Sequence, residues 1–141
     1  MNREEIKALI PHREPMLLID RTELQADGSG MCWYRVPEDA WYCRGHFPGY
    51  PIVPGVILCE IMAQSTCQLF PEAFQNNLLV YRGMDRVKFR SSVYPGDECE
   101  ITCRLLEKKS SLYICETALR VKGKLCASAV LTLAAIRSGA E

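Results

Sequence analysis

Hydrophobic positions alternate along some segments of the chain and follow a helical period along others, which predicts a mixture of strands and helices. A helical pattern over Glu4–Ile10 ends at Pro11. Two alternating segments flank the turn cluster of residues 27–30 and predict a hairpin. Later in the chain, alternation broken by short turns predicts antiparallel strands joined by hairpins. The expected strands are Met16–Leu24, Met31–Val36, Leu78–Tyr81, Val87–Phe89, Glu98–Leu106, Leu112–Val121 and Leu125–Ile136.

The most apolar segment predicts a helix over Gly55–Phe70, which begins after Pro54 and ends at Pro71. Apolar residues lie around most of its circumference, so this helix should be buried on several sides. A sheet that curves around it would bury the helix together with one face of every strand. The pattern therefore predicts one α+β domain over residues 1–141, with Arg137–Glu141 as a frayed tail.

The composition of the 141 residues is that of an ordinary soluble protein, with 48% hydrophobic and 24% charged residues. Lys and Arg together number 17, as do Asp and Glu, and this balance argues against a nucleic-acid partner. The chain start is charged, and no segment is long and apolar enough to span a membrane. Its eight cysteines include no C-x-x-C pair, so we expect reduced, buried thiols in a cytoplasmic protein.

Between the hairpin and the long helix lies a loop rich in proline, glycine and aromatic residues, which contains His46. Its prolines exclude regular structure and stiffen the loop, and a stiff loop suits the placing of a functional group. Glu60 lies one and a half turns into the helix, among apolar neighbours. A carboxyl group in apolar surroundings can stay protonated and act as a general acid, while a neutral histidine is a suitable general base.

The residues alone leave this acid–base interpretation open, because a loop histidine is usually structural and a helical glutamate usually faces water. Gly55 is an independent sign, since the first turn of a helix has unpaired N–H groups that can hold an oxyanion. His12 is interpreted as structural, because nothing in the sequence places it within reach of a reacting proton. The sequence contains no nucleotide or phosphate motif and no metal-binding motif.

The segment Gly45–Gln64 resembles the signature of the 3-hydroxyacyl-[acyl-carrier-protein] dehydratases of bacterial type II fatty-acid synthesis. Residues Ile10–Arg21, and Met84–Arg90 with Val93–Asp97, resemble the opening and the middle strands of that family. The resemblance implies a hot-dog fold, in which an antiparallel sheet wraps around the central helix. It also implies a hydro-lyase that converts a (3R)-3-hydroxyacyl chain on acyl carrier protein to the trans-2-enoyl thioester, without metal or cofactor.

The resemblance assigns roles to three residues. His46 would take a proton from C2, the Gly55 N–H would hold the thioester oxygen, and Glu60 would protonate the departing hydroxyl. It implies a homodimer in which His46 of one subunit meets Glu60 of the other, with three dimers forming a hexamer. The further substrate-binding or orienting candidates are Phe47, Pro54, Gln64 and Tyr81. Acyl carrier protein is acidic, and the candidates for docking it are Arg82, Arg86, Lys88 and Arg90.

Several points stay open at this stage. Gln64 either orients the carboxyl or packs the helix, and Tyr81 gates the substrate tunnel unless Val80 takes that place. Glu60 in place of Asp favours a plain dehydratase over relatives that also form the cis-3-enoyl product. The alternatives are such an isomerising enzyme, an enzyme of a specialised polyketide or polyene pathway, a hot-dog thioesterase, and a non-catalytic acyl-binding protein.

Overall fold

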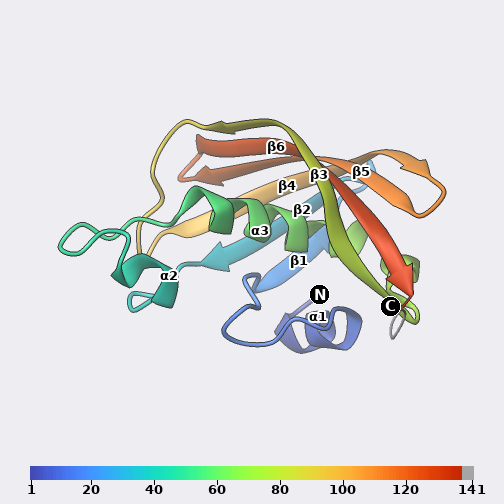
Figure 1. The fold of residues 1–141 in the computed structure, drawn as a ribbon, viewed down its shortest axis with the longest axis horizontal. Coiled ribbons are helices and arrows are strands. Elements are labelled where there is room, and N and C mark those ends of the chain that lie inside the picture. Colours follow the sequence, from blue (N-terminus) through green and yellow to red (C-terminus); the bar gives the residue numbers. More distant parts are fainter. Residues whose placement is uncertain (138–141) are drawn as a thin grey trace.

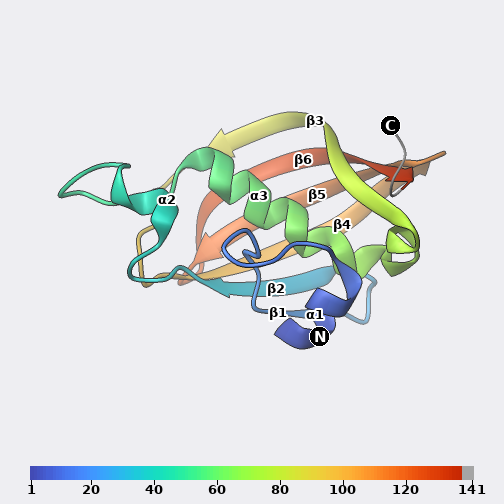
Figure 2. The ribbon, with the colours of Figure 1, turned by 60° about the horizontal axis from the view of Figure 1, so that its bottom comes forward.

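The computed structural model describes residues 1–137, in which six strands form an antiparallel sheet that curves around the long helix α3 (Figures 1 and 2). The strand order is β1-β2-β4-β5-β6-β3. The helices are α1 (Arg3–Leu9), α2 (Trp41–Arg44) and α3 (Gly55–Ser65), followed by the 3-10 helices η1 (Thr66–Leu69) and η2 (Pro71–Phe74). The strands are β1 (Arg21–Leu24), β2 (Gly30–Arg35), β3 (Asn77–Phe89), β4 (Glu98–Lys109), β5 (Leu112–Val121) and β6 (Lys124–Arg137).

The core lies between α3 and the concave face of the sheet. Ile61 and Met62 of α3 are completely buried, and so are Ile101, Leu119 and Leu131 of the strands. Each fully buried side chain of this size contributes roughly 1.5–3 kcal/mol to folding. The predicted α+β hot-dog fold is therefore confirmed, and the helix is buried on several sides, as its apolar residues predict.

Strand β3 corrects the prediction of two separate strands in this region, because it runs unbroken for 13 residues at the edge of the sheet. Two register shifts against β6 interrupt its alternation, one after Tyr81 and one after Asp85. As a result Tyr81 pairs with Leu133 and Met84 pairs with Leu131, so both lie on the same face of the sheet. Without a bulge, alternation would place Tyr81 and Met84 on opposite faces. The first bulge thus places both side chains on the helix side of the sheet.

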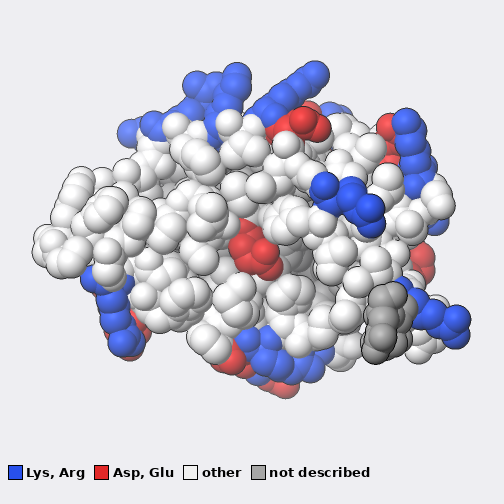
Figure 3. All heavy atoms as spheres, viewed as in Figure 1, with Lys and Arg blue, Asp and Glu red and all other residues white. Residues whose placement is uncertain are grey.

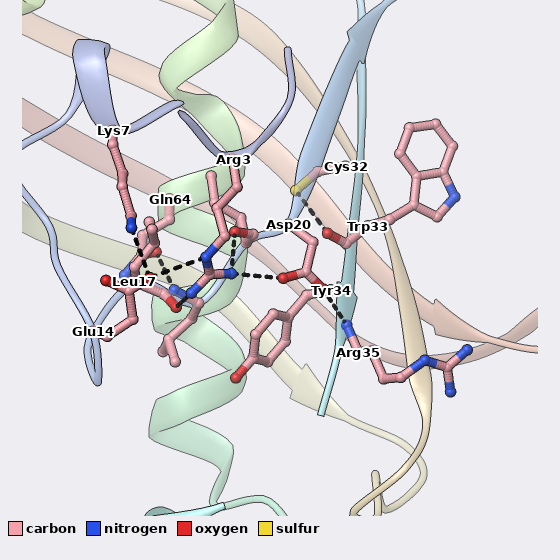
Figure 4. Close-up of polar contacts among 12 residues, drawn as sticks. Arg3, Lys7, Glu14, Leu17, Asp20, Cys32, Trp33, Tyr34, Arg35 and Gln64 are labelled. Carbon is pink, nitrogen blue, oxygen red and sulfur yellow. Dashed lines mark hydrogen bonds and ion pairs between the residues drawn. The ribbon is translucent and has the colours of Figure 1, made fainter. Parts of the chain in front are cut away.

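The strand predicted over residues 16–24 is confirmed only for its last four residues. The preceding residues lie beside α3 as an irregular segment (Figure 2), and several of their backbone groups pair with side chains. The Leu18 N–H donates to Gln64 Oε1 at 2.8 Å, and Gln64 Nε2 donates to the Met16 carbonyl at 2.7 Å. Arg3 donates to two further carbonyls of the segment (Figure 4). These backbone groups therefore form hydrogen bonds without pairing to a neighbouring strand.

Other boundaries differ from the prediction in smaller ways. The long helix ends at Ser65 and continues as 3-10 turns, and the loop before it contains the short helix α2. In the predicted tail, Arg137 ends β6 and residues 138–141 lie outside the described residues. All eight cysteines are free and buried, as expected. Burial raises the pKa of Cys67 and of Cys99 to about 12, which makes these thiols unreactive at neutral pH.

Candidate active site

Glu60 lies on the face of α3 that borders a small cavity of about 50 Å³. The polar lining of this cavity includes Glu60, Gln64 and His12, whereas much of the remaining wall is apolar. The Glu60 side chain is 22% exposed, so its carboxyl is accessible from the cavity but not freely solvated. Figure 3 shows an acidic group in the middle of this view, surrounded by uncharged atoms. Apolar lining residues include Phe74, Leu79 and Leu133.

The side-chain amide of Gln64 is fixed by hydrogen bonds and donates to the Glu60 carboxyl. Its Nε2 donates to Glu60 Oε2 at 2.9 Å and to the Met16 carbonyl, and its Oε1 accepts from the Leu18 N–H. These three bonds fix which end of the amide is the donor. The buried side chain therefore packs the helix and contacts the carboxyl at once, which joins the two alternatives of the sequence analysis. Its role in catalysis stays a prediction.

His12 is the residue that sequence reasoning missed. Its Nε2 lies 3.6 Å from Glu60 Oε2, whereas the sequence analysis placed it apart from the site. The N-terminal segment carries it there by crossing α3, and Arg13 fixes the local backbone by donating to the Ile10 and His12 carbonyls. No local pattern reveals a contact between residues so far apart in the chain, so the sequence held no signal for it.

Tyr81 lines the cavity beside Glu60, and Val80 does not. The Tyr81 hydroxyl donates to the Cys59 carbonyl of α3 at 2.7 Å. Burial raises the pKa of Tyr81, and the nearby Glu60 raises it further, so the hydroxyl keeps its proton at neutral pH. The register thus favours Tyr81 over Val80 as the candidate at the tunnel, and its gating role stays a prediction.

His46 lies in the loop between α2 and α3, with its ring half-buried. Its Nδ1 is 3.3 Å from the Ile52 carbonyl, and because a carbonyl only accepts, this contact requires the hydrogen on Nδ1. The lone pair then lies on Nε2, as a general base needs. The Phe47 ring stacks on the imidazole at 4.3 Å and is itself 52% exposed. Within the described chain, no hydrogen bond or ion pair joins His46 to Glu60.

The start of α3 contains Gly55, the oxyanion donor expected from the sequence, and that role stays a prediction. Pro54 caps the helix, and its carbonyl accepts from the N–H groups of Ile57 and Leu58. The Gly55 N–H precedes these, and within residues 1–137 it has no hydrogen-bond acceptor. A Cβ at Gly55 would lie 2.9 Å from the Phe89 ring, so glycine lets the edge strand approach the helix start.

Three of the four docking candidates, Arg86, Lys88 and Arg90, line a groove of about 500 Å³. The groove lies on the face of the sheet turned away from α3, since Lys88 pairs with Ser128 between the core residues Ala127 and Ala129. Arg104 and Arg120 add to its positive charge, and Glu116 opposes it. Figure 3 shows Lys and Arg side chains gathered along the top edge of the molecule. Arg82, at the first bulge of β3, is not among the lining residues.

Residues 1–137 contain no group of three or more His, Cys, Asp or Glu side chains arranged to hold a metal ion. Over the same residues, every helix is too short or too polar to cross a membrane.

The chain is similar to dehydratases in sequence and to hot-dog proteins in structure. The model of the ApeI-like family, described as ApeI dehydratase, matches residues 23–129. The 3-hydroxyacyl-[acyl-carrier-protein] dehydratases FabZ of Streptococcus pyogenes serotypes M3 and M1 are 38% identical over 136 residues, which cover 95% of this chain and 98% of each relative.

Two solved structures show the same fold. The dehydratase heterocomplex ApeI:P from Xenorhabdus doucetiae has a TM-score of 0.79 at 18% identity, over 94% of this chain and 91% of that chain. A thioesterase mutant from Pseudomonas aeruginosa has a TM-score of 0.68 at 17% identity, over 97% of this chain and 95% of that chain. At these identities the structural likeness shows the fold alone, and it does not separate a dehydratase from a thioesterase.

Proposed function

Because the chain belongs to the 3-hydroxyacyl-[acyl-carrier-protein] dehydratase family, we propose that it removes water from (3R)-3-hydroxyacyl chains on acyl carrier protein in fatty-acid synthesis. The observation that carries the proposal is the Glu60 carboxyl, held by Gln64 at the edge of a largely apolar cavity. Apolar walls beside the carboxyl suit contact with an acyl chain, and a partly buried carboxyl suits a general acid. We further propose a single cytoplasmic domain over residues 1–141 that needs no metal or cofactor.

The active site is completed by a second copy of the chain. His46 and Glu60 share no contact within one chain, and β3 leaves one edge of the sheet unpaired. An edge strand of 13 residues with exposed apolar side chains is a template for pairing with another strand. The exposed apolar side chains near this edge and the His46 loop include Phe47, Tyr50, Val56, Met84 and Phe89. A dimer would cover them, and three dimers would form the hexamer that the family resemblance implies.

The reaction follows from three groups. His46 Nε2 takes a proton from C2 of the substrate, and the electron pair moves toward the thioester carbonyl. The Gly55 N–H stabilises the charge that develops on the carbonyl oxygen, and one such donor is worth about 3 kcal/mol. Glu60 gives its proton to the 3-hydroxyl, which leaves as water while the C2–C3 double bond forms. Each assisted proton transfer accelerates the reaction by roughly 10²–10⁴-fold.

The expected result of incubating the protein with a crotonyl thioester is reversible hydration to the 3-hydroxyacyl thioester. Mass spectrometry separates this product, heavier by one water, from the free acid that a thioesterase would release. An acyl-binding protein would leave the thioester unchanged. Release of free acid without hydration would overturn the proposed function, and an assay of longer 3-hydroxyacyl chains scored for cis-3 product tests the isomerising alternative.

The double variant Arg86→Glu/Lys88→Glu is expected to raise the KM for carrier-protein-bound substrate by roughly tenfold at low salt, with kcat little changed. The reason is that both side chains line the basic groove and would repel an acidic partner. The measurement is initial rate against substrate concentration at two ionic strengths, because screening weakens such attraction. Lys122→Glu/Lys124→Glu is the matched control, since it changes the net charge equally and both lysines are exposed but lie outside the groove. An equal KM for the double variant and the control would contradict this docking site.

A further inference from the structure

Both polar neighbours of the Glu60 carboxyl contact the same oxygen. Gln64 Nε2 donates to Oε2 at 2.9 Å, and His12 Nε2 lies 3.6 Å from that same atom. The nearby Tyr81 hydroxyl donates its one hydrogen to the Cys59 carbonyl and so does not donate to the carboxyl. Among the described residues, Oε1 has no hydrogen-bond or ion-pair partner. An acidic hydrogen on Glu60 therefore belongs on Oε1, because Oε2 accepts from Gln64.

The environment of His12 decides which of its nitrogens carries a hydrogen. Nδ1 is buried and has no hydrogen-bond partner, and the side chain as a whole is 29% exposed. A buried N–H without an acceptor is rarer in proteins than an unpaired acceptor. The hydrogen therefore belongs on Nε2, where it points toward Glu60. At 3.6 Å the contact is longer than a hydrogen bond, and such contacts in unliganded sites tighten when substrate binds.

We propose that His12 is a positioning residue that, together with Gln64, holds Oε2 of Glu60 and so presents Oε1 to the 3-hydroxyl of the substrate. This inference rests on the proposed dehydration. As Glu60 gives up its proton, negative charge spreads over both carboxylate oxygens, and the two N–H groups on Oε2 bind it more strongly than they bind the neutral acid. An interaction that strengthens in this way lowers the barrier to the proton transfer.

The test compares His12→Gln with His12→Met, two side chains of similar length of which only glutamine carries an N–H donor. Loss of an interaction made mainly in the transition state lowers kcat more than it changes KM. We expect His12→Met to lower kcat by about tenfold at nearly unchanged KM, since a hydrogen bond to a charged group is worth roughly that factor or more. His12→Gln should recover most of the loss. Equal melting temperatures would exclude a general structural effect.

Two outcomes would overturn the inference: a His12→Met enzyme with the kcat of the parent, or equal losses in both variants. A second measurement needs no variant at position 12. Nitrogen NMR of the parent protein near neutral pH should show the His12 hydrogen on Nε2, and a neutral ring protonated on Nδ1 would contradict the proposal. The two hypotheses fail separately, because a parent protein that does not hydrate the crotonyl thioester refutes the dehydratase assignment whatever His12 does.

Discussion

Mixed dimers of His46→Ala and Glu60→Gln chains are expected to regain activity that neither variant has alone. Each single change removes one proton-transfer group and should lower kcat/KM for dehydration by roughly 10²–10⁴-fold. In a two-fold symmetric dimer with shared sites, a mixed pair combines an intact His46 from one chain with an intact Glu60 from the other. One of its two sites is then complete, while the other carries both defects.

Random pairing makes half of the dimers mixed, so the unfractionated mixture should recover about a quarter of the activity of the parent protein, and purified mixed dimers should recover about half. The measurement is the dehydration rate of chains co-expressed with different tags, after purification on both tags to enrich the mixed dimers. The control mixes the double variant with the parent chain, because every site of that mixed dimer lacks one group. If the mixed dimers of His46→Ala and Glu60→Gln chains stay inactive, His46 and Glu60 of one active site do not come from different chains.

Gly30→Ala is expected to destabilise the protein by about 3 kcal/mol, the largest effect we predict outside the active site. A Cβ at this position would lie 2.5 Å from Cδ of Gln68, which has 4% of its surface exposed. The Gln68 amide donates to the Met31 and Ser65 carbonyls at 3.1 and 3.0 Å, so it cannot move without leaving buried groups unpaired. Glycine is therefore required where β2 meets the end of the helix.

For a chain of this length the loss corresponds to a melting temperature lower by roughly 10 °C. Thermal and urea unfolding of the variant and the parent measure it. Gly83→Ala is the matched control, because a Cβ there meets no atom within 4 Å. A Gly30→Ala protein as stable as the Gly83→Ala control would mean that Gln68 rearranges at little cost.

The sequence predicted the parts of the fold that local pattern determines. Strand β5 has the predicted bounds Leu112–Val121, because its alternation is regular and turns close both ends. The helix start at Gly55 was equally clear, since Pro54 cannot continue a strand and suits the first position of a helix. Bulges such as those in β3 could not be predicted, because they depend on how β3 pairs with β6 rather than on its own residues.

The candidate site likewise contains one contact that local spacing predicts and others that it does not. Glu60 and Gln64 share a helix face because they are four residues apart, and that contact follows from helical geometry. The approach of His12 to Glu60 depends on a chain crossing between distant segments, which no local spacing encodes. The proposed meeting of His46 with Glu60 needs a second molecule, so it follows neither from the spacing of residues nor from the fold of one chain.

The Gln64 amide connects the N-terminal segment to the Glu60 carboxyl, since its nitrogen donates one hydrogen to the Met16 carbonyl and the other to the carboxyl. A change that shifts the backbone at Met16 would thus alter the orientation of the Glu60 carboxyl, although Met16 does not line the cavity beside it. In homologous enzymes with the same pair of hydrogen bonds, the N-terminal segment and the long helix would evolve as a unit.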